Sequence, residues 1–273
     1  MIIIAGKSGQ LGNSLVLYAG FVAYSIERNV KVYNPSFYRY ASYFDFTSQN
    51  YKLNSRFAFN SLFWFTRILI KLKIRNAKEI DWHESVDLDT NLPFGNINTP
   101  LFVQGWQYRG NACLEKHKVK ILNLFTPKKI YLEKLNAFFE QHFSNSEEII
   151  IAVHIRRGDY RTFENGKYFY SIDQYQQLMN NVAELFTGSK IHFLVCSNET
   201  YTVSDFAGVN HTITFGLAHE LLDMYSMARC HYIIGPPSTY TMWASFYGST
   251  PLCMVHDINK QIELKEFKVQ SSF

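Results

Sequence analysis

The chain has 273 residues, of which 47% are hydrophobic, and it carries a formal net charge of +4. This length and apolar content allow a substantial buried core, which excludes a disordered or fibrous protein. The small net charge argues against a nucleic-acid-binding protein. The four cysteines form no CxxC pair, so neither a zinc site nor a disulfide framework is predicted, and a cytoplasmic location is favoured.

The first elements of the chain are predicted to form an α/β unit. The apolar run from Ile2 to Ala5 predicts a buried strand rather than a secretory leader, and a helix is expected from about Leu15 to Arg28. Gly9, Gly12 and Asn13 are expected in the loop between them, where glycine lets the backbone approach a ligand and Asn can bind a sugar hydroxyl. A simple tight turn is the alternative.

The longest apolar run extends from Phe57 to Arg75. Arg67, Lys71 and Lys73 interrupt it before it could span a bilayer. Two interpretations are open: a core helix whose cationic side chains reach water, and a helix that lies on the anionic inner face of a membrane. The core helix is favoured because residues of these apolar types are mostly buried.

Two further features precede the middle of the chain. Asp87 and Asp89 spell DxD, a pattern with which other sugar transferases hold a divalent ion. The triplet lies in the polar stretch 76–98 without a flanking strand, so a surface turn is favoured and no metal is predicted. Trp106 and Tyr108 suit either a platform on which a sugar stacks or a buried aromatic corner.

A second α/β unit is predicted from Ile149 onward. The continuous apolar run Ile149 to Ile155 is typical of a strand inside a parallel sheet, and we place the domain boundary near Asn145. Helices are then predicted at Ser171 to Phe186, Ala218 to Cys230 and Thr241 to Phe246. Buried strands are predicted between them, at Ile191 to Ser197 and His231 to Gly235. This rhythm predicts a doubly wound nucleotide-binding domain, whose ligands bind beyond the carboxyl ends of the strands.

The segment Val153 to Tyr160, VHIRRGDY, carries the sharpest functional signal. A buried strand runs directly into Arg156 and Arg157, and a guanidinium can hold two phosphate oxygens at any physiological pH. We therefore expect Arg156 or Arg157 to bind a diphosphate. Because alternate residues of an extended segment face opposite ways, one arginine can reach the ligand while the other pairs with Asp159. A structural ion pair at a strand end is the alternative.

HIRRGDY resembles the HxRRxD motif of the GDP-fucose-dependent fucosyltransferases, especially the bacterial α-1,2-fucosyltransferases of glycosyltransferase family eleven. Other segments are similar to motifs of the same family, namely Gly9 to Ala19, Val103 to Arg109, Leu194 to Glu199 and Asp223 to Gly248. The resemblance implies a GT-B-like α/β fold class, with two facing Rossmann-like domains and a cleft between them. In that fold, residues 1–145 would form the acceptor side and residues 146–273 would bind the nucleotide sugar.

The resemblance also implies an activity, an inverting transfer of fucose from GDP-fucose to a hydroxyl of a glycan. It implies an α-1,2 linkage in surface polysaccharide or oligosaccharide synthesis, with no metal and no cofactor beyond the donor substrate. Donor-binding roles are implied for His154 and Asp223 at the guanosine, Arg156 and Arg157 at the diphosphate, and Ser238 and Thr239 at the phosphates. A helix that begins after Ser238 would aim its N–H groups at an anion, and an ordinary N-cap is compatible with that role.

The expected catalytic residues are Arg157, which would stabilise the leaving GDP, and a general base chosen from Asp159 and Glu199. Asp159 has a second interpretation, in which it only orients the arginines. The acceptor side is expected to include Gly9, Gly12, Asn13, Trp106 and Tyr108. Two other functions stay open, a transferase of the same fold that uses another nucleotide sugar and a non-catalytic glycan-binding protein.

Overall fold

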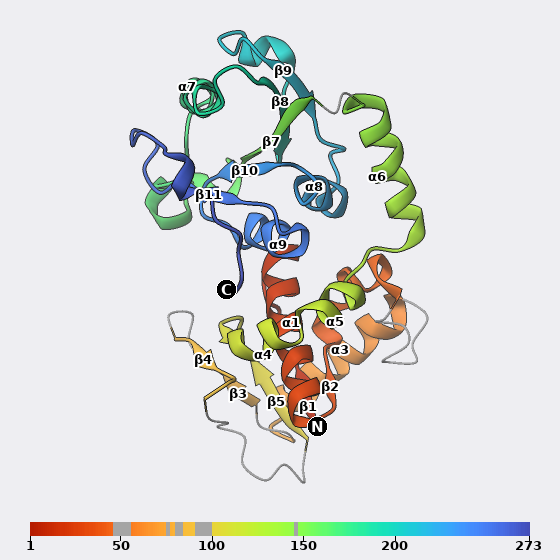
Figure 1. Cartoon of the computed structure of the whole chain (residues 1–273). Helices are drawn as coiled ribbons and strands as arrows, with labels where there is room; N and C mark the ends of the chain where they lie inside the picture. The colour runs from red at the N-terminus through yellow and green to blue at the C-terminus, as the bar shows by residue number, and fades with distance from the viewer. Residues whose placement is uncertain (46–55, 75–76, 80–83, 91–99, 145–146) are drawn as a thin grey trace. The chain divides into compact units, whose positions relative to one another are not determined.

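A computed structural model describes residues 1–45, 56–74, 77–79, 84–90, 100–144 and 147–273. These residues form two compact units, Met1–Tyr131 with Ser271–Phe273 and Leu132–Gln270. The division falls inside helix α6 (Lys129–His142), ahead of the boundary near Asn145 that the sequence suggests. Each unit is an α/β structure built on a parallel sheet, as the sequence predicts (Figure 1).

The first unit is built on a parallel sheet with the strand order β2-β1-β5-β3. Its strands are β1 (Ile2–Ile4), β2 (Val32–Tyr33), β3 (Ala77–Glu79) and β5 (Leu101–Gln104). A separate parallel pair joins β4 (Val86–Asp87) and β6 (Tyr108–Arg109). The helices are α1 (Leu11–Arg28), α3 (Arg56–Lys71), α4 (Asn111–Lys116) and α5 (Lys118–Leu124), with short 3-10 helices at Pro35–Arg39 and Ala41–Tyr43.

Helix α1 begins at Leu11, one turn earlier than expected. Leu11 and Leu15 lie one turn apart and are both buried, so the additional turn adds an apolar residue to the core. Gly12 and Asn13 consequently belong to the first turn of α1, which corrects their expected position in the loop. Gly9 does lie in the loop after β1, with a φ of 86° that favours glycine.

The second unit is a five-stranded parallel sheet with the order β11-β10-β7-β8-β9. Its strands are β7 (Glu148–Ile155), β8 (Lys190–Ser197), β9 (Thr212–Phe215), β10 (Tyr232–Gly235) and β11 (Leu252–Met254), and its helices besides α6 are α7 (Ile172–Glu184), α8 (Glu220–Met227) and α9 (Thr239–Gly248). The sequence predicts β7, β8, β10 and α7 with ends close to these. Helix α8 begins later than expected because Ala218 has a φ of 52° and His219 forms the N-cap, and it ends at Met227, before the expected Cys230.

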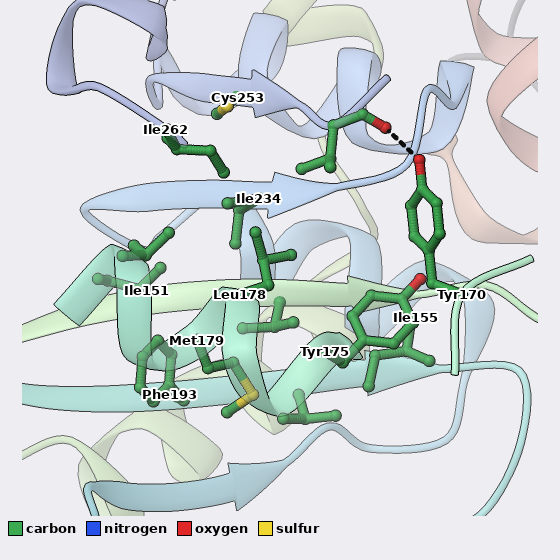
Figure 2. Close-up of a cluster of buried hydrophobic side chains, with 14 of the residues drawn as sticks. Ile151, Ile155, Tyr170, Tyr175, Leu178, Met179, Phe193, Ile234, Cys253 and Ile262 are labelled. Atoms are coloured by element: carbon green, nitrogen blue, oxygen red, sulfur yellow. Dashed lines mark hydrogen bonds between the residues drawn. The ribbon is translucent and has the colours of Figure 1, made fainter. Parts of the chain in front are cut away.

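The central strand β7 presents different side chains to the two faces of the sheet. Ile151, Val153 and Ile155 belong to the core cluster that α7 covers through residues such as Tyr175 and Leu178 (Figure 2). The alternating side chain of His154 faces the other way and meets α9, where it stacks on Tyr240. The segment after Ile155 therefore lies at the carboxyl edge of the sheet, beside the start of α9.

Candidate functional site

Arg156 is held in place by Asp159 just after β7. Its Nε and Nη2 donate hydrogen bonds to Oδ1 and Oδ2 of Asp159 at 3.0 and 2.7 Å. Burial opposes the charge of Arg156, but the hydrogen bonds with Asp159 leave its pKa above the ordinary value, and they lower the pKa of Asp159. The expected pairing of one arginine with Asp159 is thus confirmed for Arg156. Both oxygens of Asp159 are engaged, which favours its orienting role.

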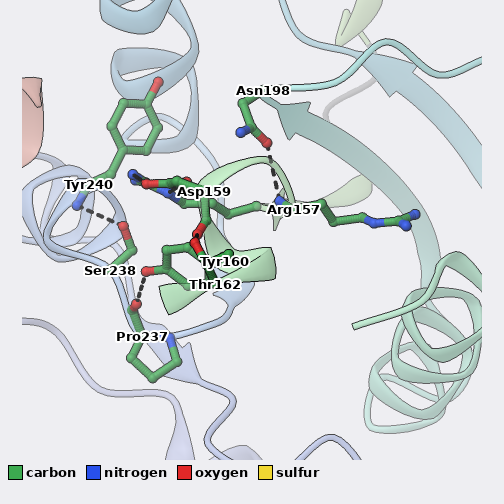
Figure 3. A network of polar contacts seen from close by, with 9 residues as sticks. Arg157, Asp159, Tyr160, Thr162, Asn198, Pro237, Ser238 and Tyr240 are labelled. Atoms are coloured by element: carbon green, nitrogen blue, oxygen red, sulfur yellow. Dashed lines mark hydrogen bonds and ion pairs between the residues drawn. The ribbon is translucent and has the colours of Figure 1, made fainter. Parts of the chain in front are cut away.

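Arg157 takes the opposite direction. Its side chain points away from Asp159, Ser238 and Tyr240, while its backbone N–H donates to Oδ1 of Asn198 at 3.2 Å (Figure 3). The guanidinium lies over the ring of Phe169 at 4.8 Å, and its buried Nε is 3.7 Å from Oε2 of Glu199. The two neighbouring arginines therefore occupy different sides of the strand end.

Glu199, the second candidate base, follows β8. Its Oε2 accepts a hydrogen bond from the hydroxyl of Tyr201 at 2.5 Å. Burial and the bond to Glu199 raise the pKa of Tyr201 to about 12, so this hydroxyl remains a donor at neutral pH. Within the described part of the chain, the other carboxylate oxygen of Glu199 accepts no hydrogen bond. Glu199 is thus less fully engaged than Asp159.

His154 is buried and uncharged. Its ring stacks on Tyr240 with 5.2 Å between the centroids, and its Nδ1 has no hydrogen-bond partner among the described residues. Burial, assisted by the positive charge of Arg156, lowers the pKa of His154 from 6.5 to about 3. The imidazole is therefore neutral at physiological pH and can act as a hydrogen-bond donor or acceptor, but not as a counter-ion.

Asp223 is a buried carboxylate in α8. Its Oδ1 accepts the backbone N–H of Leu217 at 2.6 Å. Burial raises the pKa of Asp223 to about 6, although hydrogen bonds from the backbone of Leu217 and His219 oppose the shift. Tyr240 connects this region to the strand end, because its hydroxyl donates to the carbonyl of Glu220 at 2.6 Å while its ring stacks on His154.

Ser238 and Thr239 lie at the N-terminus of α9. Ser238 is the N-cap, and its Oγ accepts the backbone N–H of Tyr240 at 3.2 Å (Figure 3). The hydroxyl of Tyr160 donates to the carbonyl of Pro237 at 2.5 Å, while its ring lies 5.0 Å from the guanidinium of Arg156. Tyr160 therefore ties Arg156 to the start of α9, where backbone N–H groups and the helix dipole favour an anion.

The structure brings together the residues predicted at the ends of β7, β8 and β10. Tyr160, Tyr240 and Phe169 take part in the same arrangement, although the sequence predicts no role for them. A signal exists for Tyr160 alone, because it directly follows Asp159 in the VHIRRGDY segment. The other two rings are recognisable only after folding, when Tyr240 lies against His154 and Phe169 lies under Arg157.

The residues predicted for the acceptor side belong to the first unit. A Cβ at Gly9 would lie 2.8 Å from Nδ2 of Asn13, so the Asn13 side chain folds back over this glycine. Tyr108 is fully buried and packs against Phe21 with 5.3 Å between the ring centroids, which is the aromatic-corner alternative. Trp106 is partly exposed, and the guanidinium of Arg109 lies 5.0 Å from its ring.

The two carboxylates of the DxD triplet accept hydrogen bonds from backbone N–H groups and one hydroxyl. Asp87 accepts hydrogen bonds from Asp89 N and Thr90 Oγ1, and Asp89 accepts the N–H groups of Ala112 and Cys113 at the start of α4. These contacts are those of a structural turn, which the sequence favours. Among the residues that the structure describes, no group of three His, Cys, Asp or Glu side chains could hold a metal ion.

Two further expectations from the sequence concern cysteines and membrane spans. The four cysteines are buried and unpaired, at Cys113, Cys196, Cys230 and Cys253. Across the described ranges, none of the helices combines the length and the apolar character required to cross a bilayer.

No protein-family model and no curated protein matches the sequence. Several solved structures do match it. Arabidopsis thaliana FUT1, a mutant in complex with GDP, is 13% identical with a TM-score of 0.60, and the match covers 97% of this chain and 71% of that chain. The α-1,6-fucosyltransferase NodZ, soaked with GDP-fucose, is 16% identical with a TM-score of 0.59 and coverages of 97% and 96%. The NodZ fucosyltransferase from Bradyrhizobium matches at 16% identity with a TM-score of 0.57 and coverages of 93% and 94%.

This likeness confirms the predicted GT-B-like α/β fold class, because the matches extend over nearly the whole chain. At such low identity it is a likeness of fold, and function must be argued from the site. The α-1,2 subtype of family eleven stays a prediction.

Proposed function

We propose that the protein is a glycosyltransferase that transfers fucose from GDP-fucose to a hydroxyl group of a glycan acceptor. Support comes from a fold shared with fucosyltransferases, whose solved structures include complexes with GDP and GDP-fucose. The observation that carries the proposal is the position of Arg156. Asp159 fixes its guanidinium against Tyr160, and Tyr160 bonds the residue before the N-cap of α9.

We assign the diphosphate to Arg156 and the N-terminus of α9. A guanidinium and a helix N-terminus both favour negative charge, and here the two are linked through Tyr160. Ser238 and Thr239 would add hydroxyl groups at the same place. Arg157 is the second cation of the proposed site, and we expect it to contribute less to binding free GDP because its side chain points away from Ser238 (Figure 3).

The guanosine is assigned to Asp223 and His154. An ionised carboxylate can accept hydrogen bonds from the N–H groups on one edge of guanine, an edge that uracil lacks. His154 is neutral, and its Nδ1 has no hydrogen-bond partner in the described ranges, so it would contribute polarity without adding charge.

In the proposed reaction, the acceptor oxygen forms a bond to the anomeric carbon of fucose while the bond from that carbon to the β-phosphate oxygen breaks. GDP leaves with the bonding electron pair, and the hydroxyl proton passes to a general base. Attack from the face opposite GDP inverts the anomeric centre. Negative charge accumulates on the β-phosphate, so stabilisation by fixed cations and backbone N–H groups would be the main contribution to the rate.

We propose Glu199 as the general base in place of Asp159. Both oxygens of Asp159 bind Arg156, whereas Glu199 retains one oxygen that the described residues do not engage. Removing a proton requires a carboxylate oxygen within hydrogen-bond reach of the acceptor hydroxyl. Asp159 would then act through Arg156 as a positioning residue.

The finer parts of the proposal rest on the resemblance of HIRRGDY to its motif. They are an α-1,2 linkage, a role in surface polysaccharide or oligosaccharide synthesis and independence from metals. A cytoplasmic location is proposed on a separate ground, the four unpaired cysteines. A donor other than GDP-fucose and a non-catalytic glycan-binding role are the alternatives.

Calorimetric titration of GDP, GMP and UDP in the presence of EDTA tests the donor site. We expect GDP to bind more tightly than GMP and UDP. Arg156→Ala should weaken GDP binding by about 100-fold, as the loss of charge-assisted hydrogen bonds predicts, and Arg157→Ala should weaken it less. The matched control is Arg229→Ala, because Arg229 follows α8 and bonds Asn136 away from the strand ends that carry the site.

Transferase activity is measured on the same preparations as nucleotide release from GDP-fucose, GDP-mannose or UDP-galactose in the presence of a panel of galactosides. Release of GDP from GDP-fucose that depends on a galactoside supports the proposed transfer. Release only from another donor would assign the fold to a different nucleotide sugar. If no nucleotide binds while glycans do, the glycan-binding alternative replaces the enzyme.

A further inference from the structure

Helix α3 presents a broad apolar face to solvent. The exposed fractions are 79% for Phe57, 51% for Trp64, 58% for Phe65, 52% for Ile68 and 63% for Leu72. Leu72 directly follows α3 and continues its last turn through a hydrogen bond to Ile68. With a turn of about 100° per residue, these five side chains fall within about 100° of the helix circumference, an arc that they share with the exposed Ser61. We refer to these five residues as the α3 apolar face. Several large apolar side chains exposed on one side of a helix favour an interaction site in a folded protein.

The opposite side of α3 attaches the helix firmly to its own unit. Phe63 and Thr66 are buried, and the ring of Phe63 packs against Tyr38 with 5.5 Å between the centroids. Arg67 donates a hydrogen bond to Oε1 of Gln104 at 2.9 Å, which joins the helix to the end of β5. Among the residues that the structure describes, the core-helix interpretation therefore holds for this side of α3, and the α3 apolar face lies exposed on the other.

The stretch of sequence that contains α3 carries charge of a single sign. The segment from residue 46 to 78 contains no Asp or Glu, and its basic residues are Lys52, Arg56, Arg67, Lys71, Lys73, Arg75 and Lys78. The whole chain holds 27 basic and 23 acidic residues, so this segment accounts for all of the net positive charge. Lys71 and Lys73 are exposed, and Nζ of Lys7 lies 5.9 Å from the centre of the Trp64 ring.

We propose that the α3 apolar face binds the surface of a membrane that contains anionic phospholipid. Aromatic and aliphatic side chains would enter the boundary between headgroups and acyl chains, and the flanking lysines would meet the anionic headgroups. Trp64 suits the headgroup level because its ring is apolar while its N–H remains polar. A second copy of the same face is disfavoured as the occupant, because two such surfaces would bring like charges together.

Co-sedimentation with vesicles tests this proposal directly. We expect the protein to sediment with vesicles of mixed phosphatidylcholine and phosphatidylglycerol, less with phosphatidylcholine alone, and less at high salt. Two variants should each bind the anionic vesicles at least about tenfold more weakly than the wild type. They are Phe65→Ser/Ile68→Ser/Leu72→Ser and Lys71→Glu/Lys73→Glu. GDP binding and circular dichroism should stay unchanged in both, which would show that they fold.

The matched control is the variant Val203→Ser/Leu264→Ser. These two apolar residues lie in the second unit and are 62% and 48% exposed, but they lack a basic segment around them. This variant should bind the vesicles like the wild type. Tryptophan emission should shift to the blue on addition of anionic vesicles, and Trp64→Phe should abolish the shift.

Equal vesicle binding by the wild type and the serine variant of α3, or no binding to anionic vesicles, would overturn the proposal. Light scattering tests whether the α3 apolar face instead mediates self-association. A dimer in solution that the α3 variants convert to monomer would assign the face to self-association and reject the membrane. The proposal is independent of the donor site, so its failure would leave the transferase assignment untouched.

Discussion

Asp159 accepts two hydrogen bonds from the guanidinium of Arg156, at 3.0 and 2.7 Å, and both of its carboxylate oxygens are used in doing so. Arg157, one residue further along, extends the other way towards Glu199, with 3.7 Å between Nε and Oε2. Each arginine of the pair thus faces a different carboxylate. The roles of the four side chains can be separated by single substitutions.

The substitution Asp159→Asn tests the orienting role. Asparagine keeps one oxygen that can accept from Arg156, so we expect turnover to fall by no more than about tenfold, well below the 100-fold or larger loss typical of a missing general base. Steady-state kinetics with GDP-fucose and a galactoside would measure it. Asp173→Asn, an acidic residue in the first turn of α7, serves as the control. A loss above 100-fold with unchanged GDP affinity would make Asp159 the base.

The substitution Glu199→Gln should lower turnover strongly, in contrast to Asp159→Asn. If Glu199 removes the acceptor proton, kcat should fall by about 100-fold while the Kd for GDP changes less than about threefold. If Glu199 only positions Arg157, the loss should appear in the Kd for GDP instead. Tyr201→Phe removes the hydroxyl that donates to Glu199 and should reduce kcat by a smaller factor. Measuring kcat and Kd on the same preparations separates the two roles.

GDP affinity should depend on the ionisation of Asp223. Burial raises the pKa of this carboxyl to about 6, so it is ionised above that pH and protonated below it. A carboxylate that accepts N–H groups of guanine binds in its ionised form, and affinity should therefore be lost as the pH falls through 6, by about tenfold per pH unit. The terminal phosphate of GDP also titrates near this pH. The ratio of wild-type to Asp223→Asn affinity, measured from pH 5 to 8, isolates the carboxyl, and a constant ratio would contradict its role.

Two N-cap serines in the same unit separate helix capping from ligand binding. Ser238 caps α9 and Ser171 caps α7, each with Oγ 3.2 Å from a backbone N–H. Replacing either by alanine should lower the free energy of unfolding by about 1 kcal/mol. Only Ser238→Ala should also weaken GDP binding, by about tenfold, because α9 alone begins at the proposed diphosphate site. Chemical denaturation and calorimetry measure the two effects, and equal GDP affinity in both variants would remove Ser238 from the site.

Several elements were predictable from the sequence because their signals are local. The unbroken apolar run Ile149 to Ile155 predicts a central parallel strand, since both faces of such a strand are covered. Ser171 marks the start of α7 because a hydroxyl at that position accepts a backbone N–H. The sequence does not reveal the edge strands β9 and β11, because each is defined by pairing with one neighbouring strand rather than by an apolar pattern of its own.

The sequence by itself determined that two adjacent arginines leave a buried strand in different directions, because alternation along an extended chain is a local property. Only the tertiary structure decided which of them lies at α9, since Arg156 reaches that helix through a contact between Tyr160 and Pro237, residues 77 positions apart. The same holds for α3. The sequence shows the mixture of apolar and basic residues in α3, but whether a face of the helix is buried depends on what the rest of the chain packs against it. In the part of the chain that the structure describes, Phe63 and Thr66 are buried and the α3 apolar face is exposed.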